Sequence, residues 1–320
     1  MITIYKEINK TLDKKVYENI DEVKLEVGSW IHVKDPTQEV LEKLSILTDI
    51  PSDLLLCALD EEESARIDVD DGNTLIVLDT PYLSDKEKGL YSSAPFIIAY
   101  NYEYYVTIER HNFELMDELF KRVKLIEPHK HVRLTLNIVY RLATLFITYL
   151  KRINNYTDEL EKKIRNSTKN KEVLDLMDIN KSLIYFSTAL NGDKGVLAKL
   201  LKSQTYSRFE SDYDLMEDTQ VEINQAVEMC NILRDVLTGM MDAFASIINN
   251  NMNVIMKSLT VITIVISIPN IIASLFGMNL DDLPLAHSDH GFYIILVVSI
   301  ILSIIGAIAL ILLSNRNKTK

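Results

Sequence analysis

The chain has 320 residues, with 46 Asp and Glu against 34 Lys and Arg, and its formal net charge at pH 7 is −12. An acidic balance disfavours nucleic acid as a partner and favours cations. We do not expect an enzyme, because motifs for phosphate cradling, zinc proteolysis and nucleophilic catalysis are absent from the sequence. Cys57 and Cys230 are far apart without a CxxC pair, which favours packed thiols over a disulfide or zinc site.

Residues 1–125 are typical of an α/β domain. Short apolar runs predict strands, turn residues separate some of them, and a helix is expected at residues 37–47 after Pro36. We expect a largely antiparallel or mixed sheet. The expected strands are residues 2–5, 30–33, 74–78, 96–100 and 104–108, with turns at residues 71–73 and 101–103.

Residues 126–257 are predicted to be helical, because no proline lies between Pro128 and Pro269 and glycines are few. We expect two helices in residues 126–210 and then a stalk helix, residues 211–257, that continues into a membrane span. The expected breaks are residues 166–170, 191–193 and 203–211.

The stalk helix carries an apolar repeat in alternating steps of three and four, which is the period of a supercoiled seam. A helix that packs only on the two preceding helices of its own chain has the same repeat, and both arrangements stay open. The repeat consists of Ile223, Ala226, Cys230, Leu233, Leu237, Met240, Phe244 and Ile247.

Two uncharged apolar segments, residues 258–276 and 292–313, have about the length needed to cross a lipid bilayer. Basic residues lie just before the first segment and just after the second. The loop between the two segments, residues 280–291, contains no Lys or Arg. Because positive residues stay inside, we expect a multi-pass cell-membrane protein with the α/β domain and both termini, including the tail at 314–320, in the cytoplasm. The flanking basic residues are Lys257, Arg316, Lys318 and Lys320.

The first span carries one stripe that is polar except at a single methionine. Such a stripe turns toward protein or toward a water-filled path, and not toward lipid. It lines a pore if several copies surround one axis, or it joins helices through small residues and hydrogen bonds. The stripe consists of Asn253, Met256, Thr260, Thr263, Ser267, Asn270 and Ser274.

The order of features near the C-terminus resembles the CorA family of divalent-cation channels. Met256-Lys257-Ser258-Leu259-Thr260 opens the first span, Pro269 lies within it, Gly277-Met278-Asn279 ends it, and a short acidic loop, a second span and a basic tail follow. The helices and the α/β domain match in layout only. The resemblance implies a homopentamer with five first spans (residues 258–279) around the pore, an outer ring of second spans, and a cytoplasmic funnel.

The resemblance also implies the roles of single residues. Gly277, Met278 and Asn279 form the selectivity filter, where five neutral amide oxygens bind hydrated Mg²⁺ weakly enough to release it. Asn253, Met256, Leu259, Thr263, Ser267 and Asn270 face the pore, with Met256 and Leu259 in an apolar constriction. The stripe agrees at five of these positions and has Thr260 in place of Leu259.

A cytoplasmic brake on influx is expected, since the membrane potential drives a divalent ion inward by ~4.6 kcal/mol per 100 mV. The resemblance places regulatory Mg²⁺ at Asp218 and Asp242 on the long helix, and Asp85 is the expected partner on the α/β domain.

The sequence departs from the family in the loop, which lacks a Pro-Glu-Leu triplet. Its charged and histidine residues are Asp281, Asp282, His287, Asp289 and His290. The two histidines suit Zn²⁺, Co²⁺ or Ni²⁺, although a mobile polar loop is favoured. The other histidines have no paired acids at metal spacing and are expected to be structural; they are His32, His111, His129 and His131.

The expected function is therefore influx of Mg²⁺, with Co²⁺ or Ni²⁺ as further ions, gated by cytoplasmic Mg²⁺. Two alternatives stay open. One is a zinc-transporting relative of the same family, and the other is a membrane-anchored sensor or scaffold with a coiled-coil stalk.

Overall fold

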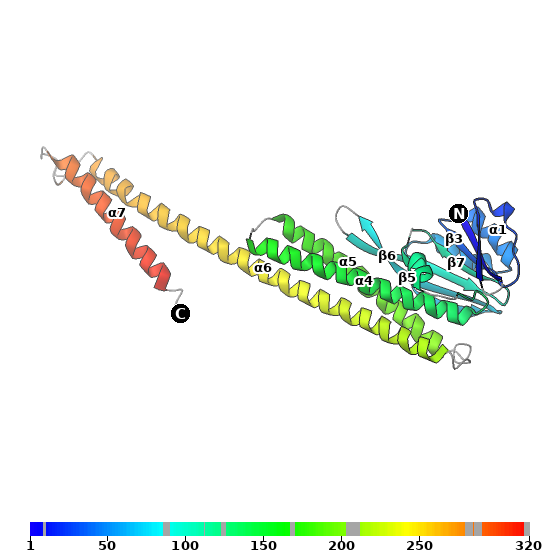
Figure 1. Ribbon diagram of the computed structural model, residues 1–320. Coiled ribbons are helices and arrows are strands. Elements are labelled where there is room, and N and C mark those ends of the chain that lie inside the picture. Colours follow the sequence, from blue (N-terminus) through cyan, green and yellow to red (C-terminus); the bar gives the residue numbers. More distant parts are fainter. Residues whose placement is uncertain are drawn as a thin grey trace. The chain divides into compact units, whose positions relative to one another are not determined.

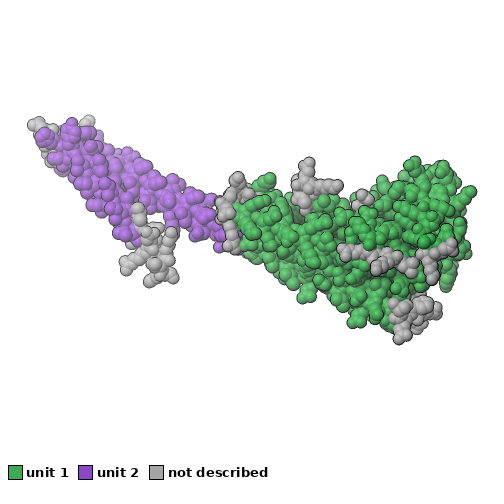
Figure 2. All heavy atoms as spheres, in the orientation of Figure 1, with its two compact units in different colours: residues 1–241 green, residues 242–320 purple. Residues whose placement is uncertain are grey.

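The computed structural model describes residues 1–8, 11–85, 90–111, 113–122, 126–166, 170–202, 212–278, 284 and 290–316. The chain divides into two compact units, Met1–Met241 (unit 1) and Asp242–Lys320 (unit 2), which Figure 2 shows in different colours.

Unit 1 contains a seven-stranded mixed sheet of order β2-β1-β3-β7-β6-β5-β4. Only the central β3–β7 pair is parallel, and the other neighbouring pairs are antiparallel, as the turn-linked runs in the sequence predict. The strands are β1 (Ile2–Ile8), β2 (Thr11–Tyr17), β3 (Trp30–Lys34), β4 (Arg66–Asp70), β5 (Asn73–Asp85), β6 (Leu90–Tyr100) and β7 (Tyr105–Glu109).

All five predicted strands are present, but the two edge strands, β2 and β4, were not predicted. β2 has no buried residue and carries Lys14 and Lys15, a composition that protects a sheet edge from pairing with another chain but hides the strand signal. The turn before β5 is the predicted one. Asp71 and Gly72 both have positive φ, of 42° and 81°, as a two-residue hairpin turn requires.

Helices cover both faces of the sheet (Figure 1). On one face, α1 (Gln38–Thr48) and α2 (Ser52–Leu56) bury Leu41, Leu44 and Leu55 against strand residues such as Ile31 and Val106. This is the apolar core of the α/β domain. Two short 3₁₀ helices, Ile20–Glu22 and Cys57–Leu59, flank these helices in sequence.

The other face of the sheet is covered by α3 (Leu115–Arg122), α4 (His131–Asn166) and α5 (Asn170–Lys202). Aromatic side chains lie at the centre of this interface between the sheet and the helices. The fully buried Trp30 stacks on Phe120 of α3, with ring centroids 5.7 Å apart, and Tyr105 Oη lies 2.9 Å from Thr135 Oγ1 of α4.

The expected helix break at residues 191–193 was wrong, because α5 runs without interruption through it. Gly192 is there for close packing. A Cβ atom added to it lies 2.9 Å from the Ala65 Cβ beside β4, so only glycine lets the helix approach this closely. The next residue, Asp193, is fully buried and accepts a 2.8 Å hydrogen bond from the Asp79 backbone N–H of β5. The expected break at 166–170 is present, and the one at 203–211 lies outside the described residues.

Helix α6 (Tyr213–Phe276) is continuous from the stalk into the first predicted span, as expected. Within unit 1 the seam residues of α6 from Ile223 to Leu237 are buried, and α6 contacts α4 and α5 of the same chain. Thr144 Oγ1 of α4 lies 3.4 Å from Glu222 Oε1, and Cys230 Sγ donates to the Leu183 carbonyl of α5 at 3.5 Å. Here the repeat packs on its own chain's preceding helices.

Candidate functional site

Two helices of the described chain are long and apolar enough to cross a membrane: α6, and α7 (Gly291–Arg316). Both belong to unit 2 over their apolar stretches. Most large apolar side chains there are exposed, among them Ile262, Ile266 and Ile301, each at least half exposed. A chain in water does not leave so much apolar surface uncovered, whereas lipid covers it without loss.

Within unit 2, α7 packs on one face of α6. A Cβ atom added to Gly306 of α7 lies 2.9 Å from Ile268 Cδ1 of α6, so this glycine brings the two helices close. Ser303 and Ser299, about one and two turns before Gly306, are buried as well. Small residues at such spacing let membrane helices approach. The large apolar residues of this span that are partly covered are Val261, Val265, Ile268, Ile272 and Phe276, and Ser267 and Pro269 are partly covered as well.

The predicted polar stripe lies on the opposite side of α6. At about 100° per residue, its centre is ~150° around the helix from the residues that α7 covers. Asn253, Thr260, Thr263, Asn270 and Ser274 are exposed, and Ser267 is partly exposed. Met256 and Leu259 are 53% and 55% exposed, so the two alternatives for the constriction, Leu259 and Thr260, are both uncovered. The described chain therefore provides no partner for its most polar membrane face.

Three of the four hydroxyl groups of this stripe have their donors occupied. Thr260, Thr263 and Ser267 each donate to the backbone carbonyl four residues earlier, at 2.8, 2.9 and 2.7 Å. Each oxygen keeps its lone pairs for another partner. The exposed face is thus rich in acceptor oxygens, which suit a hydrated cation.

The end of α6 leads directly to the predicted filter. The Gly277 N–H donates to the Ala273 carbonyl at 2.9 Å, and the Met278 N–H to the Leu275 carbonyl at 3.4 Å, so the helical pattern persists to the filter's edge. Met278 is 51% exposed. Asn279 and the loop residues Asp281, Asp282, His287 and Asp289 lie outside the described residues. His290 is exposed, and its carbonyl accepts the Ile294 N–H at 3.1 Å in the first turn of α7.

Comparison with known proteins decides the family. Residues 26–314 match the family described as CorA-like Mg²⁺ transporter protein. The chain belongs to the CorA family. Members are divalent-cation transporters of membranes and not enzymes.

One CorA relative and two solved structures match along most of the chain. The cobalt/magnesium transport protein CorA of Methanocaldococcus jannaschii is 27% identical over 285 residues, which cover 86% of this chain and 87% of that protein. The complete structure of the CorA magnesium transporter from the same organism has a TM-score of 0.81 at 25% identity and covers 97% of this chain and 96% of that one. The full-length CmaX protein, at 15% identity, shares the fold with a TM-score of 0.69 and covers 98% and 96%.

Of the three regulatory residues expected from the CorA resemblance, the structure describes the side chains of Asp218 and Asp242. Asp218 and Asp242 are exposed on α6, in unit 1 and unit 2 respectively. Asp85 lies at the end of β5, paired with Leu90, and its side chain is outside the described residues.

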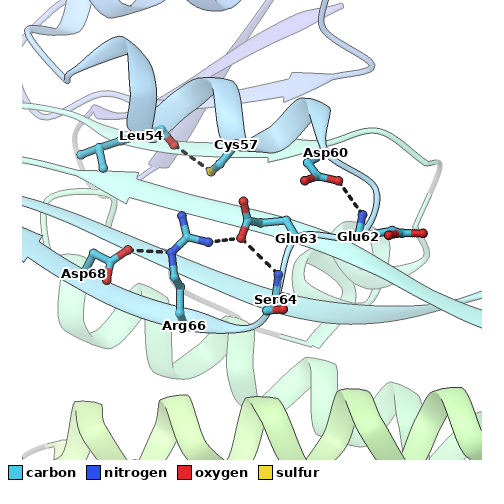
Figure 3. Close-up of polar contacts among 8 residues, drawn as sticks. All are labelled: Leu54, Cys57, Asp60, Glu62, Glu63, Ser64, Arg66 and Asp68. Atoms are coloured by element: carbon cyan, nitrogen blue, oxygen red, sulfur yellow. Dashed lines mark hydrogen bonds and ion pairs between the residues drawn. The ribbon is translucent and has the colours of Figure 1, made fainter.

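Part of an acidic run beside β4 is paired with Arg66 (Figure 3). Arg66 forms ion pairs with Glu63 and with Asp68, the latter at 2.7 Å, and Glu61 pairs with Arg110 at 3.4 Å. The Asp60 carboxylate accepts a hydrogen bond from the Glu62 backbone N–H, and the Glu63 carboxylate accepts one from the Ser64 backbone N–H. Glu61, Glu63 and Asp68 are therefore paired with arginines within unit 1.

Both cysteines are free thiols, as predicted. Cys57 Sγ donates to the Leu54 carbonyl at 3.0 Å (Figure 3), and burial raises the pKa of this thiol to about 12. Burial likewise raises the pKa of Cys230 to about 11. Neither thiol is ionised near neutral pH, so neither is a ready metal ligand.

Three of the four histidines in unit 1 are structural, as expected. His32 is buried with Nδ1 2.9 Å from Thr107 Oγ1, His111 stacks on Tyr82 at 4.5 Å, and burial lowers the pKa of His131 to about 4. The fourth, His129, is exposed and lies beside two glutamates, Glu7 and Glu127, so for it the expectation stays a prediction. Sequence spacing did not reveal this group, because Glu7 comes from the first strand of the chain.

Proposed function

We propose that the chain is a channel that conducts Mg²⁺, and also Co²⁺ or Ni²⁺, into the cytoplasm as a homopentamer. The observation that carries the proposal is the uncovered polar face of α6, opposite the face on which α7 packs. Polar side chains in a membrane turn toward protein or water. Five copies of α6 around one axis provide both, with the α7 helices on the outside against lipid.

The acceptor-rich face suits a hydrated divalent ion. Mg²⁺ keeps its waters, whose hydrogens point outward and seek acceptors. The hydroxyls of Thr260, Thr263 and Ser267 present such acceptors because their own protons are bonded within the helix. A ring of neutral Asn279 amides at the outer end selects the ion without holding it as tightly as carboxylates do. Met256 and Leu259 narrow the path with apolar side chains.

The cobalt and magnesium named for the relatives support the choice of ions. The basic residues beside the spans support a cytoplasmic position for both termini, since Lys257 precedes the apolar stretch of α6 and Arg316 ends α7. The membrane potential then drives influx without an energy-coupling site.

Ion flux into liposomes that contain only this protein tests the proposal. We expect uptake of Mg²⁺, Co²⁺ and Ni²⁺ under an inside-negative potential, and a pentamer by mass measurement in detergent. Zinc uptake that exceeds magnesium uptake identifies instead the zinc-transporting alternative. Absence of any flux, with a monomer or dimer by mass, supports the membrane-anchored sensor or scaffold and contradicts the channel.

The stripe is tested by Asn270→Leu, which replaces an exposed amide by an apolar side chain of similar size. We expect Mg²⁺ uptake to fall at least ~10-fold, because the path loses a ring of polar groups. Ile262→Leu is the matched control: Ile262 is 54% exposed but lies off the stripe, and its variant is expected to conduct normally. Equal uptake by both variants contradicts the pore assignment.

Regulation by cytoplasmic Mg²⁺ is part of the proposal. Asp218 of one copy and Asp85 of its neighbour share an ion, with Asp242 as a second acidic position nearer the membrane, and the bound ion neutralises carboxylates that otherwise repel. This favours the closed arrangement through differential affinity. Asp218→Ala is expected to conduct at internal Mg²⁺ levels that silence the parent protein, with assembly retained. Closure at the parent's concentration identifies Asp218 as a surface acid only.

A further inference from the structure

Three metal-ligating side chains meet in unit 1. Glu7 lies at the end of β1, and Glu127 and His129 lie in the segment between α3 and α4, with one ligand atom of each within 4.8 Å of the others. His129 Nδ1 is 3.3 Å from Glu7 Oε2. In a tetrahedral site with bonds of about 2.1 Å, donor atoms are ~3.4 Å apart. This pair therefore already has the spacing that one bound ion imposes.

The backbone that carries these three side chains is held in place. Glu7 shares a face of β1 with Tyr5, which packs on Phe120 of α3 with ring centroids 5.0 Å apart. Ile126 and Pro128 are buried and fix the second segment at alternate positions. A turn closed by the Lys130 N–H on the Glu127 carbonyl, at 3.0 Å, has Pro128 at its second position, where proline is favoured. Ligands on such fixed elements need little reorganisation to bind.

One carboxylate oxygen in the group lacks a hydrogen bond. Glu7 Oε2 is buried and accepts no hydrogen bond from the described part of the chain; its ion-pair partner is His129. An unsatisfied buried oxygen is unfavourable, and a metal ion satisfies it. Lys130 Nζ lies 2.8 Å from Glu127 Oε1, so Lys130 competes with an ion for this carboxylate, although a carboxylate offers a second oxygen.

We propose that Glu7, Glu127 and His129 form a transition-metal site that takes Zn²⁺, Co²⁺ or Ni²⁺ and links β1 to the segment before α4. The imidazole nitrogen decides the class of ion. Imidazole suits zinc, nickel and copper, whereas Mg²⁺ prefers oxygen ligands alone. Three protein ligands leave the remaining positions to water. The site differs in chemistry from the oxygen-lined path of α6, and its existence does not depend on conduction.

Cobalt titration of the full chain in detergent, after removal of bound metal with a chelator, tests the site. Co²⁺ bound by nitrogen and oxygen ligands at low coordination number has a visible absorption band. This band is much stronger than that of the hydrated Co²⁺ ion. We expect one such Co²⁺ per chain, displaced by ZnCl₂ and retained in excess MgCl₂. His129→Ala and Glu7→Gln are each expected to weaken binding at least ~10-fold, since even an outer partner of a metal ligand contributes that much.

Two control variants sharpen the result. Lys130→Gln removes the competing ammonium group and is expected to bind Co²⁺ as tightly as the parent or more tightly. His290→Ala removes an exposed loop histidine and is expected to keep the band. His129 is 56% exposed, so His129→Ala tests the site even if Glu7→Gln does not fold.

The proposal is overturned if the parent lacks the band, which identifies Glu7 and His129 as an ion pair only. It is equally overturned if the band and affinity persist in His129→Ala, or if only His290→Ala loses them, because the ion then binds elsewhere. The measurement reports binding at equilibrium, so it is independent of whether the protein conducts Mg²⁺.

Discussion

The two halves of α6 carry the same spacing of side chains but have opposite surroundings. In residues 213–241, within unit 1, the seam from Ile223 to Leu237 is apolar and buried by the chain's own helices. From Asp242 onward, in unit 2, the stripe around Thr263 and Asn270 is polar and uncovered.

The difference shows that a repeat of three and four residues specifies a face and not its partner. In unit 1 the apolar seam finds its partners, α4 and α5, in the same chain. In unit 2, α7 covers the apolar side of α6 around Ile268 and leaves the polar side to other copies or to water. A chain that completes one unit internally and leaves the other incomplete is expected to assemble through the incomplete one.

Of the variants that test this difference between the two halves of α6, a filter variant is expected to have the largest effect on Mg²⁺ uptake. Asn279→Ala removes the ring of amide oxygens from the outer end of the uncovered face, and we expect Mg²⁺ uptake into liposomes to fall at least ~100-fold, in line with the loss of a group essential for ion coordination. Asn251→Ala, an exposed asparagine on the side of α6 away from the stripe, is the control and should conduct normally. Full uptake by Asn279→Ala shows that the polar face does not end in a filter.

A substitution in the buried half of α6 is expected to lower the stability of the fold and not primarily the ion flux. Ala226 is fully buried in the seam, so Ala226→Asn forces in a larger polar side chain, and the free energy of unfolding should fall by ~3 kcal/mol or more. Trp30, the sole tryptophan and fully buried in unit 1, reports unfolding by fluorescence in urea. Asn270→Leu, in the uncovered half, should unfold as the parent does. An unchanged Ala226→Asn contradicts internal packing of the seam.

A buried acid pair makes unit 1 sensitive to pH. Burial raises the pKa of Asp79 to about 6 and holds that of Asp193 well above its usual range, with the Asp79 charge as a second cause. The folded chain therefore keeps a proton that the unfolded chain releases near pH 4. Stability is fullest at low pH and falls as pH rises from about 4 through about 6, by up to ~3 kcal/mol for Asp79.

Asp79→Asn removes this titration and should flatten the decrease between pH 4 and pH 6, as measured by Trp30 fluorescence in urea. Asp70→Asn, at an exposed acid on the neighbouring strand β4, should leave it unchanged. The same slope in all three proteins means that other groups set the pH dependence.

The smallest effects are expected at two glycines of α5. A Cβ atom on Gly192 lies 2.9 Å from the short, rigid Ala65 side chain, so Gly192→Ala should lower stability by ~1–3 kcal/mol. Gly195 has no atom within 4 Å of an added Cβ, and Gly195→Ala should raise stability by ~0.5–1 kcal/mol because alanine favours helix. Thermal unfolding of both variants measures the difference. Equal effects of the two changes contradict close packing at Gly192.

Local patterns in the sequence were sufficient for much of the fold. The five apolar runs, the Asp71-Gly72 turn and the two spans depend on neighbouring residues, and periodicity reports them directly. The polar stripe of α6 was likewise readable, because helical geometry alone places Thr263, Ser267 and Asn270 on one face. The filter residues came from the family resemblance, and Asn279 stays a prediction.

Only the tertiary structure decided which faces meet, because those contacts join residues far apart in the chain. Gly192 resembles a helix breaker until β4 is seen to pack against it, and Asp193 meets Asp79 across 114 positions. Glu127 lies only two residues before His129 in the sequence, but the fold of β1 is needed to bring Glu7 beside them. Periodicity records the environment that a residue needs, whereas the fold determines which distant residue supplies it.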